Sequence, residues 1–489
     1  MPSPSSMFTP LSLLATVITV ANGLRLPMEA HVGSGLSRRA PNSITPITNF
    51  KNIHYMVNVT LGGQAYPVQI DTGRFDLPSS ADLWIYDDVP NAKDTGVLSN
   101  VTYAVGTVTG SVLQAPMSFG GYDVPAQDFI HVTDVSSFGV DIRQLGYTGL
   151  IGLGPPISSN VFLSVNDFSA VPPMNSIFRQ NMTSQNYITI LLSRDGDPAS
   201  PASGQLTISE SIQGHESILQ QPRLPVVVET YDQFLQGNAQ LWTGMTDRDG
   251  IIGPDGKPIT VSSDIPIASG AGNGRLVTVF DTGYSLPQVP KAVADAIYAK
   301  VPGSYFNATL ENGLWTLPCT AETNITFTFG GQKIFVHPLD VSLSDIPGDV
   351  LEPVNGTTMC LGGFQPIQSP APSYDMILGM GFLRNAYILF DYGNFALESS
   401  QDQVAPYIQL LSVTNPNDAH TDFVNVRINK STTTGATGTS TGVGSTATSN
   451  TNKNSNGKSN AALERFGTVY SGCWLMVVAI GVSGVVSLF

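Results

Sequence analysis

Apolar and polar residues alternate with a period of two along much of this chain, which is the pattern of β-strands with one buried face. Residues 55–61 alternate in this way, a pair of glycines follows, and a second apolar run leads into Asp71, so a β-hairpin is expected. The alternation returns over 100–117, where Gly106 and Gly110 are positions for a turn or a bulge. The clearest helical segments are 173–180 and 290–300. The pattern therefore predicts a mainly β fold.

Two apolar runs end in the same tripeptide, Asp-Thr-Gly. It follows one run as Asp71-Thr72-Gly73 and another as Asp281-Thr282-Gly283, whereas a third copy at 94–96 has no apolar run before it. A glycine turn directly after a strand leaves the preceding carboxylate at the strand tip. Two such loops about two hundred residues apart suggest one site built twice.

A second repeat supports the duplication of a whole lobe. Leu150-Ile151-Gly152 and Ile377-Leu378-Gly379 are both two aliphatic residues followed by glycine, and each comes after its own Asp-Thr-Gly. One such triplet alone is typical of a core strand that ends in a turn. Their occurrence in the same order in both halves favours an internal duplication.

Composition and charge narrow the possible partners and cofactors. The chain has 489 residues, enough for two or three domains, and its 37 acidic and 22 basic residues give a net charge of −15. Such a field repels nucleic acid and anionic membranes. The six histidines show no H-E-x-x-H spacing, and no G-x-S-x-G motif precedes a helix. We therefore expect no metal, no cofactor and no serine nucleophile.

The N-terminus has the features of a secretory leader. A short apolar segment ends in small residues, which predicts a signal peptide over 1–23, with a buried helix or strand as the alternative. The pair Arg38-Arg39 lies in a polar stretch behind it. It is interpreted as the end of a propeptide over 24–39, so that a zymogen is expected, or alternatively as part of a solvated linker.

The C-terminus has the order of a glycosylphosphatidylinositol (GPI) attachment signal. Residues 429–460 form a stalk rich in Ser, Thr, Gly and Asn, and residues 461–489 provide a spacer and an apolar tail. Asn460 is the candidate attachment residue, with Gly457 and Ser459 as alternatives. A retained transmembrane helix is the other interpretation of the tail, although no basic residue follows it.

Cysteines and glycosylation motifs fit the same secretory route. Cys473 lies in the tail, so Cys319 and Cys360 remain and are expected to form one disulfide. It would close a loop of about forty residues and stabilise the fold by roughly 3–4 kcal/mol. The candidate N-glycosylation sites are Asn58, Asn100, Asn181, Asn307, Asn324, Asn355 and Asn429.

Together these motifs resemble the pepsin-type aspartic proteases, of the fungal GPI-anchored type, over residues 55–391. The resemblance implies a bilobal pepsin-like fold, with lobes over 40–225 and 226–428 and an active-site cleft between them. It implies that Asp71 and Asp281 are catalytic. The other implied roles are loop support by Thr72, Gly73, Thr282 and Gly283; a substrate-covering flap with Tyr103, Ala104 and Val105; flap support by Trp84; and the second-lobe disulfide, Cys319–Cys360.

Two adjacent carboxyls can hydrolyse peptides without a metal. Like charges a few ångströms apart do not both ionise, as aspartic proteases themselves exemplify, so the pair shares a proton. The ionised member activates a water and the protonated member polarises the scissile carbonyl. The expected function is a secreted, GPI-anchored aspartic endopeptidase, monomeric and at the cell surface or wall, that cleaves extended polypeptides at acidic pH.

This sequence departs from the family pattern next to both aspartates. Arg74 and Tyr284 stand where the family has Ser or Thr, and residues 74–78 lengthen the first loop. That segment is either an insertion or the product of a misplaced exon boundary. An arginine beside the pair would lower the carboxyl pKa values or displace the water. These departures motivate two alternatives: a catalytically weak pepsin-like surface binding protein, and a structural adhesin.

Overall fold

The computed structural model describes residues 44–73, 81–103, 106–167, 169–181, 185–195, 204–229, 240–263, 265, 274–308, 310, 313–344, 351–367, 373–396 and 404–429. The predicted signal peptide, propeptide and GPI tail lie outside these ranges, as does the stalk beyond Asn429. The individual residues Arg74, Ala104, Val105 and Asn460 also lie outside them.

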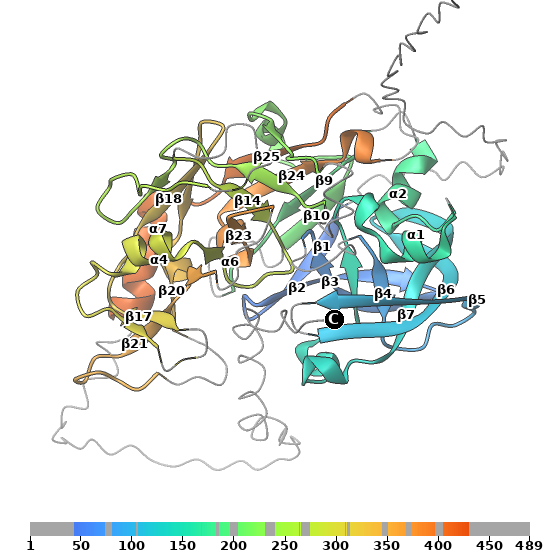
Figure 1. Ribbon diagram of the computed structural model, residues 1–489, viewed down its shortest axis with the longest axis horizontal. Helices are drawn as coiled ribbons and strands as arrows, with labels where there is room; N and C mark the ends of the chain where they lie inside the picture. The colour runs from blue at the N-terminus through green and yellow to red at the C-terminus, as the bar shows by residue number, and fades with distance from the viewer. Residues whose placement is uncertain are drawn as a thin grey trace, which may run out of the picture. The chain divides into compact units, whose positions relative to one another are not determined.

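The described chain is mainly β, as predicted, and its largest sheet contains strands from both halves of the sequence. In spatial order these are β11 (Leu224–Pro225), β25 (Tyr407–Ser412), β24 (Ala386–Asp391), β9 (Tyr187–Leu191), β10 (Gly204–Ile208), β1 (Thr45–Phe50), β2 (His54–Leu61), β3 (Gln64–Asp71), β8 (Gly149–Gly152), β4 (Leu83–Ile85), β7 (Tyr122–Asp134), β6 (Gly106–Phe119) and β5 (Lys93–Tyr103). Figure 1 shows β9 and β10 beside β24 and β25.

Three smaller sheets belong to the second half of the chain. One contains β12 (Thr243–Met245), β14 (Val277–Phe280), β23 (Met376–Leu378), β15 (Gln288–Val289) and β22 (Gln365–Pro366). Another contains β13 (Ile251–Ile252), β18 (Ile325–Phe329) and β19 (Gln332–Val336). The third contains β16 (Tyr305–Asn307), β17 (Leu314–Pro318), β21 (Met359–Gly362) and β20 (Ser342–Leu343).

Helices are short and lie mainly between strands. The α-helices are α1 (Asn160–Val165), α2 (Pro173–Phe178), α4 (Lys291–Tyr298), α5 (Pro338–Val341), α6 (Met380–Leu383) and α7 (Pro416–Phe423). Short 3-10 helices are η1 (Ser136–Phe138), η2 (Ile142–Leu145), η3 (Pro156–Ser158), η4 (Arg179–Asn181), η5 (Glu216–Gln220) and η6 (Gly393–Phe395), and η7 (Val424–Asn429) is a short π-helix. The helices predicted from 173–180 and 290–300 are thus confirmed as α2 with the start of η4, and as α4. Among the described residues, no helix is both long and apolar enough to cross a bilayer.

The predicted hairpin and the predicted lobe repeat are both present. Strands β2 and β3 pair antiparallel with Met56 opposite Gln69. In the first half β3 runs parallel to β8, and in the second half β14 runs parallel to β23. Both β8 and β23 are buried along their whole length, as expected for aliphatic strands in a parallel pair. Each Asp-Thr-Gly loop therefore lies at the end of the corresponding strand, β3 or β14, of a similar parallel pair.

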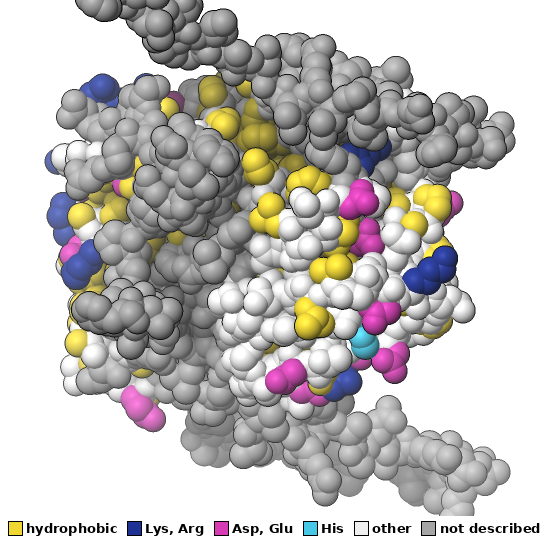
Figure 2. Space-filling view, turned by 45° about the vertical axis from the view of Figure 1, so that its right-hand side comes forward, with side chains coloured by type: hydrophobic (Ala, Val, Ile, Leu, Met, Phe, Trp, Pro, Cys, Tyr) yellow, Lys and Arg dark blue, Asp and Glu magenta, His cyan; other side chains and the backbone are white. Residues whose placement is uncertain are grey.

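One described face of the molecule carries its acidic side chains among uncharged groups (Figure 2). Figure 2 shows acidic side chains scattered over the described part of one face, among polar and backbone atoms. Only 12% of the residues in the chain are charged. On this face the described acidic side chains therefore do not form one continuous patch (Figure 2).

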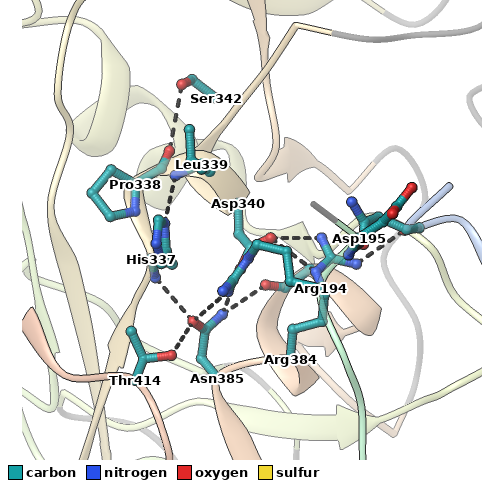
Figure 3. Close-up of polar contacts among 12 residues, drawn as sticks. Arg194, Asp195, His337, Pro338, Leu339, Asp340, Ser342, Arg384, Asn385 and Thr414 are labelled. Atoms are coloured by element: carbon teal, nitrogen blue, oxygen red, sulfur yellow. Dashed lines mark hydrogen bonds and ion pairs between the residues drawn. The ribbon is translucent and has the colours of Figure 1, made fainter. Parts of the chain in front are cut away.

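A buried charge cluster joins the two halves of the chain (Figure 3). Asp340 in α5 accepts hydrogen bonds at Oδ1 from Arg384 Nη2, at 2.7 Å, and at Oδ2 from Arg194 Nη2, at 2.5 Å. Asn385 donates to the same carboxylate at 2.9 Å. Burial by itself would raise the pKa of Asp340, but attraction to the two arginines outweighs it and holds that pKa below its usual range.

Arg384 of this cluster also hydrogen-bonds to the turn that precedes β2. Arg384 Nη1 donates to the carbonyl oxygen of Asn52 at 3.0 Å, and Ser285 Oγ donates to that of Ile53 at 2.9 Å. Ile53 packs against a cluster of second-half residues that includes Leu286 and Leu361. Because β2 pairs with β3, which ends at Asp71, these contacts fix the first aspartate loop relative to the second half.

Replacement of Asp340 tests this cluster. Asp340→Asn leaves two buried guanidinium groups without their counter-charge and should reduce the free energy of unfolding by about 3–5 kcal/mol. The midpoint of urea unfolding measures the loss. Asp255→Asn is the matched control, because Asp255 pairs with Lys300 at 3.3 Å on the surface. The urea midpoint of this variant should equal that of the parent protein. Equal losses in the two variants would contradict the role of burial.

Candidate active site

The backbone places each aspartate at the end of a buried strand. Asp71 is the last residue of β3, and its carbonyl oxygen accepts a hydrogen bond from the Leu153 amide at 2.6 Å. Asp281 follows β14, and its amide donates to the Leu378 carbonyl at 3.2 Å. In each loop the glycine amide donates to its own aspartate Oδ1, from Gly73 at 3.0 Å and from Gly283 at 2.6 Å.

The two loops bring the two carboxyls together. A methyl group on Gly73 would lie 2.6 Å from Cγ of Asp281, and one on Gly283 would lie 2.7 Å from Cγ of Asp71. Only glycine at both positions permits this approach. The carboxyls are hydrogen-bonded to each other, and the residues are only 4% and 2% exposed. The arrangement is therefore a buried, mutually bonded pair.

Burial raises the pKa of Asp281 to about 6. That pKa already includes the opposing effect of hydrogen bonds with the Gly283 amide, the Asp71 side chain and the amides of Gly73 and Tyr284, which favour the ionised form. The net direction is upward, so the pair holds a proton well above the pH at which an exposed aspartate loses one.

The two threonines lock the loops to each other in a symmetric way. Thr282 Oγ1 accepts from the Thr72 amide at 3.1 Å and donates to the Ile70 carbonyl at 3.2 Å. Thr72 Oγ1 accepts from the Thr282 amide at 3.0 Å and donates to the Phe280 carbonyl at 3.0 Å. All four bonds are buried and cross between the halves, so neither loop can shift without the other.

Tyr284 fits into the second loop without displacing it. Its side chain packs against the cluster formed by Leu241, Val277, Val279, Tyr374 and Ile377. Its carbonyl oxygen accepts a hydrogen bond from the Met380 amide at 2.7 Å. A methyl group on Gly379 would lie 2.2 Å from that oxygen, which explains the glycine at the end of the second triplet. The backbone of residue 284 thus supports the loop whatever its side chain.

Tyr103 and Trp84 are in contact, as the resemblance implied. Trp84 Nε1 donates to the Tyr103 hydroxyl at 2.5 Å. Phe138 from η1 completes an aromatic group, with ring centroids 6.3 Å from Trp84 and 6.0 Å from Tyr103. Tyr103 is the last residue of β5, and the next two flap candidates, Ala104 and Val105, lie outside the described residues.

The remaining site predictions are distributed over the surface and the second half. Cys319 and Cys360 form the expected disulfide and join β17 to β21. Six of the seven glycosylation candidates are exposed: Asn58, Asn100, Asn181, Asn324, Asn355 and Asn429. Asn307 is half-buried. Glycosylation of these residues stays a prediction. Among the described residues, no group of three His, Cys, Asp or Glu side chains could hold a metal ion.

Sequence reasoning missed several residues around the site. Asp82 is buried and accepts hydrogen bonds from Ser159 Oγ at 2.5 Å and from the Asn160 amide at 2.8 Å, which holds the start of α1. Its place in the motif Asp-Leu-Trp was the one available signal. Ser285 and Ser137 had none, because their partners are remote in sequence or are backbone groups.

Comparison with known proteins identifies the relatives of this site. A family model described as eukaryotic aspartyl protease matches residues 54–208 and 259–401, which include both Asp-Thr-Gly loops. Cathepsin D of Dictyostelium discoideum is 25% identical over 420 residues, covering 78% of this chain and 96% of that protein. Vacuolar protease A of Neurospora crassa is 24% identical, covering 72% and 79%. Human napsin-A is 24% identical, covering 77% and 83%.

Proposed function

Because the chain belongs to the eukaryotic aspartyl protease family and is a peptidase, we propose that Asp71 and Asp281 are its catalytic pair. One observation carries the proposal. The two Asp-Thr-Gly loops put two buried carboxyls in hydrogen-bonding contact, and the threonine lock and both glycines serve that contact.

The shared proton divides the chemical roles between the carboxyls. The ionised member takes a proton from a water molecule, which attacks the carbonyl carbon of the scissile peptide bond. The protonated member donates to the carbonyl oxygen and stabilises the tetrahedral intermediate. Proton transfer to the leaving amine then breaks the C–N bond. The structure does not distinguish the two carboxyls by role, because the titration belongs to the pair.

The substrate is an extended polypeptide. Peptide bonds in folded elements cannot reach a buried pair, so the substrate must enter as an open strand. We place it beneath the β5–β6 hairpin, with Tyr103, Ala104 and Val105 as the residues that cover it and Trp84 supporting Tyr103. One chain supplies both aspartates, so the proposed site is complete in a monomer.

The ends of the chain support a cell-surface location. We propose that the leader over 1–23 directs secretion, that the segment over 24–39 is removed after Arg39, and that a GPI anchor on Asn460 replaces 461–489. The seven glycosylation motifs and the disulfide suit that route.

Neutralising either aspartate should abolish hydrolysis. Asp71→Asn and Asp281→Asn should each lower kcat/KM for an unfolded protein at acid pH by about a hundred- to ten-thousandfold, because the pair can no longer supply both base and acid. Asp94→Asn is the matched control. Asp94 begins the third Asp-Thr-Gly and its Oδ1 accepts from the Gly96 amide at 2.8 Å, as in the other two loops, but it is exposed. Retained activity in either dyad variant would refute the proposal, whereas a parent chain that hydrolyses no peptide would favour a surface binding protein.

The pH profile should follow the proton on the pair. Since burial raises the pKa of Asp281 to about 6, the pair keeps its proton below that pH and loses it above. Activity should therefore decline as pH rises through about 6, when measured as kcat/KM against pH on a peptide without titratable groups. Asp94→Asn should leave the decline in place. A rate that stays constant up to pH 8 would contradict a shared proton.

The anchor can be tested by enzymatic release. The full chain, expressed in a eukaryotic secretory host, should be membrane-bound and should be freed by a phospholipase specific for phosphatidylinositol. A chain ending at Asn460 should instead be secreted into the medium. Protein that stays in the membrane after phospholipase treatment would show that the apolar tail is retained as a transmembrane helix.

A further inference from the structure

The β5–β6 hairpin extends past the strand that flanks it. Strand β7 ends at Asp134, which lies opposite Thr109 of β6. Residues 106–108 of β6 continue to pair with β5, with Thr107 opposite Thr102. In the described register, β7 therefore supplies no partner for the backbone groups of Thr107 that face away from β5.

Ser137 takes the place of that missing strand. Its hydroxyl accepts a hydrogen bond from the Thr107 amide at 3.0 Å and donates one to the Thr107 carbonyl oxygen at 2.7 Å. The contact is close, because a methyl group on Gly106 would lie 2.7–2.8 Å from Ser137. Gly106 also has φ of +152°, which a residue with a side chain rarely adopts. One hydroxyl thus satisfies both polar groups of one hairpin residue.

The next residue of η1 contacts the hairpin from another side. The Phe138 ring stacks on Trp84 at an interplanar angle of 20° and is tilted by 52° against Tyr103. Trp84 in turn donates to the Tyr103 hydroxyl. Helix η1 therefore holds both the turn end of the hairpin, through Ser137, and the tyrosine at the end of β5, through Phe138.

We propose that Ser137 is a positioning residue for substrate, which sets the resting position of the turn end of the hairpin and of Tyr103. It acts through Thr107 and touches no reacting atom. A hydroxyl that pins the hairpin removes part of the ordering that a polypeptide must otherwise impose when it binds. Its loss affects substrate and transition state alike, so it changes KM rather than kcat. This inference rests on the proposed peptidase site.

Kinetics of the full chain on an unfolded polypeptide test the assignment. Ser137→Ala should raise KM roughly five- to tenfold, with kcat changed less than about twofold, since two hydrogen bonds to one backbone residue are lost. Ser137→Thr retains the hydroxyl and should restore KM. Gly106→Ala places a methyl group against Ser137. It should therefore push the hairpin away from Ser137 and reproduce the rise in KM.

A neighbouring serine is the control. Ser136 lies in the same helix and is exposed, and its contacts are with Asp134 rather than with the hairpin. Ser136→Ala should keep the KM of the parent enzyme. An unchanged KM in Ser137→Ala, an equal rise in Ser136→Ala, or a fall in kcat at constant KM would each overturn the proposal.

Hydrogen exchange separates this proposal from the catalytic one. The Thr107 amide donates directly to Ser137, so in Ser137→Ala it should exchange roughly tenfold faster, in the active chain and equally in the Asp281→Asn variant. If the parent chain hydrolyses no peptide, the catalytic proposal fails while this measurement still applies. Unchanged protection of Thr107 in Ser137→Ala would refute the positioning role.

Discussion

Contact between two carboxyl groups in a buried place is the constraint on which the rest of this structure depends. Two ionised carboxylates could not remain there, because both desolvation and mutual repulsion oppose it. The protein resolves the conflict with one proton and a set of backbone donors, the amides of Gly73, Gly283 and Tyr284. The glycines have a second role, since a side chain on either would collide with the opposite aspartate. Hydrogen bonding to the carboxyls and close packing of the two loops thus both require glycine at these positions.

Contacts at increasing distance from Asp71 and Asp281 fix the position of the two carboxyls. The threonine lock acts within about one residue of the carboxyls. Further out, Arg384 and Ser285 hold adjacent carbonyls of the turn before β2, and β2 is the neighbour of the strand that carries Asp71. The charge on Arg384 is itself compensated by Asp340, whose pKa stays below its usual range. These ion pairs therefore persist at pH values at which exposed carboxylates are already protonated.

Local patterns in the sequence predicted what is local in the structure. Period-two alternation predicted the β2–β3 hairpin, and the repeated tripeptides predicted two equivalent loops. Both predictions succeeded because turns and strand burial are determined by residues that are neighbours in sequence. The pairing of β9 with β24 was not predictable, since about two hundred residues separate those strands and either could pair elsewhere. The ion-pair partners of Asp340 were not predicted either, because Arg194 is 146 residues away from it in sequence. The contact of Ser137 was not predicted because its partners are backbone groups of Thr107, which any residue type would provide.

Tyr284 shows why a departure from a family pattern must be judged by geometry. A hydroxyl next to the glycine could donate to Asp281, and its replacement by tyrosine suggested a weakened site. In this structure the ring joins an apolar cluster, while the amide of Tyr284 donates to the carboxylate and its carbonyl oxygen binds Met380. Backbone groups are present in every residue, so the support they give survives the substitution. The second loop therefore depends on its fold more than on the identity of the residue that follows Asp-Thr-Gly, and tyrosine is acceptable wherever the neighbouring cluster can receive the ring.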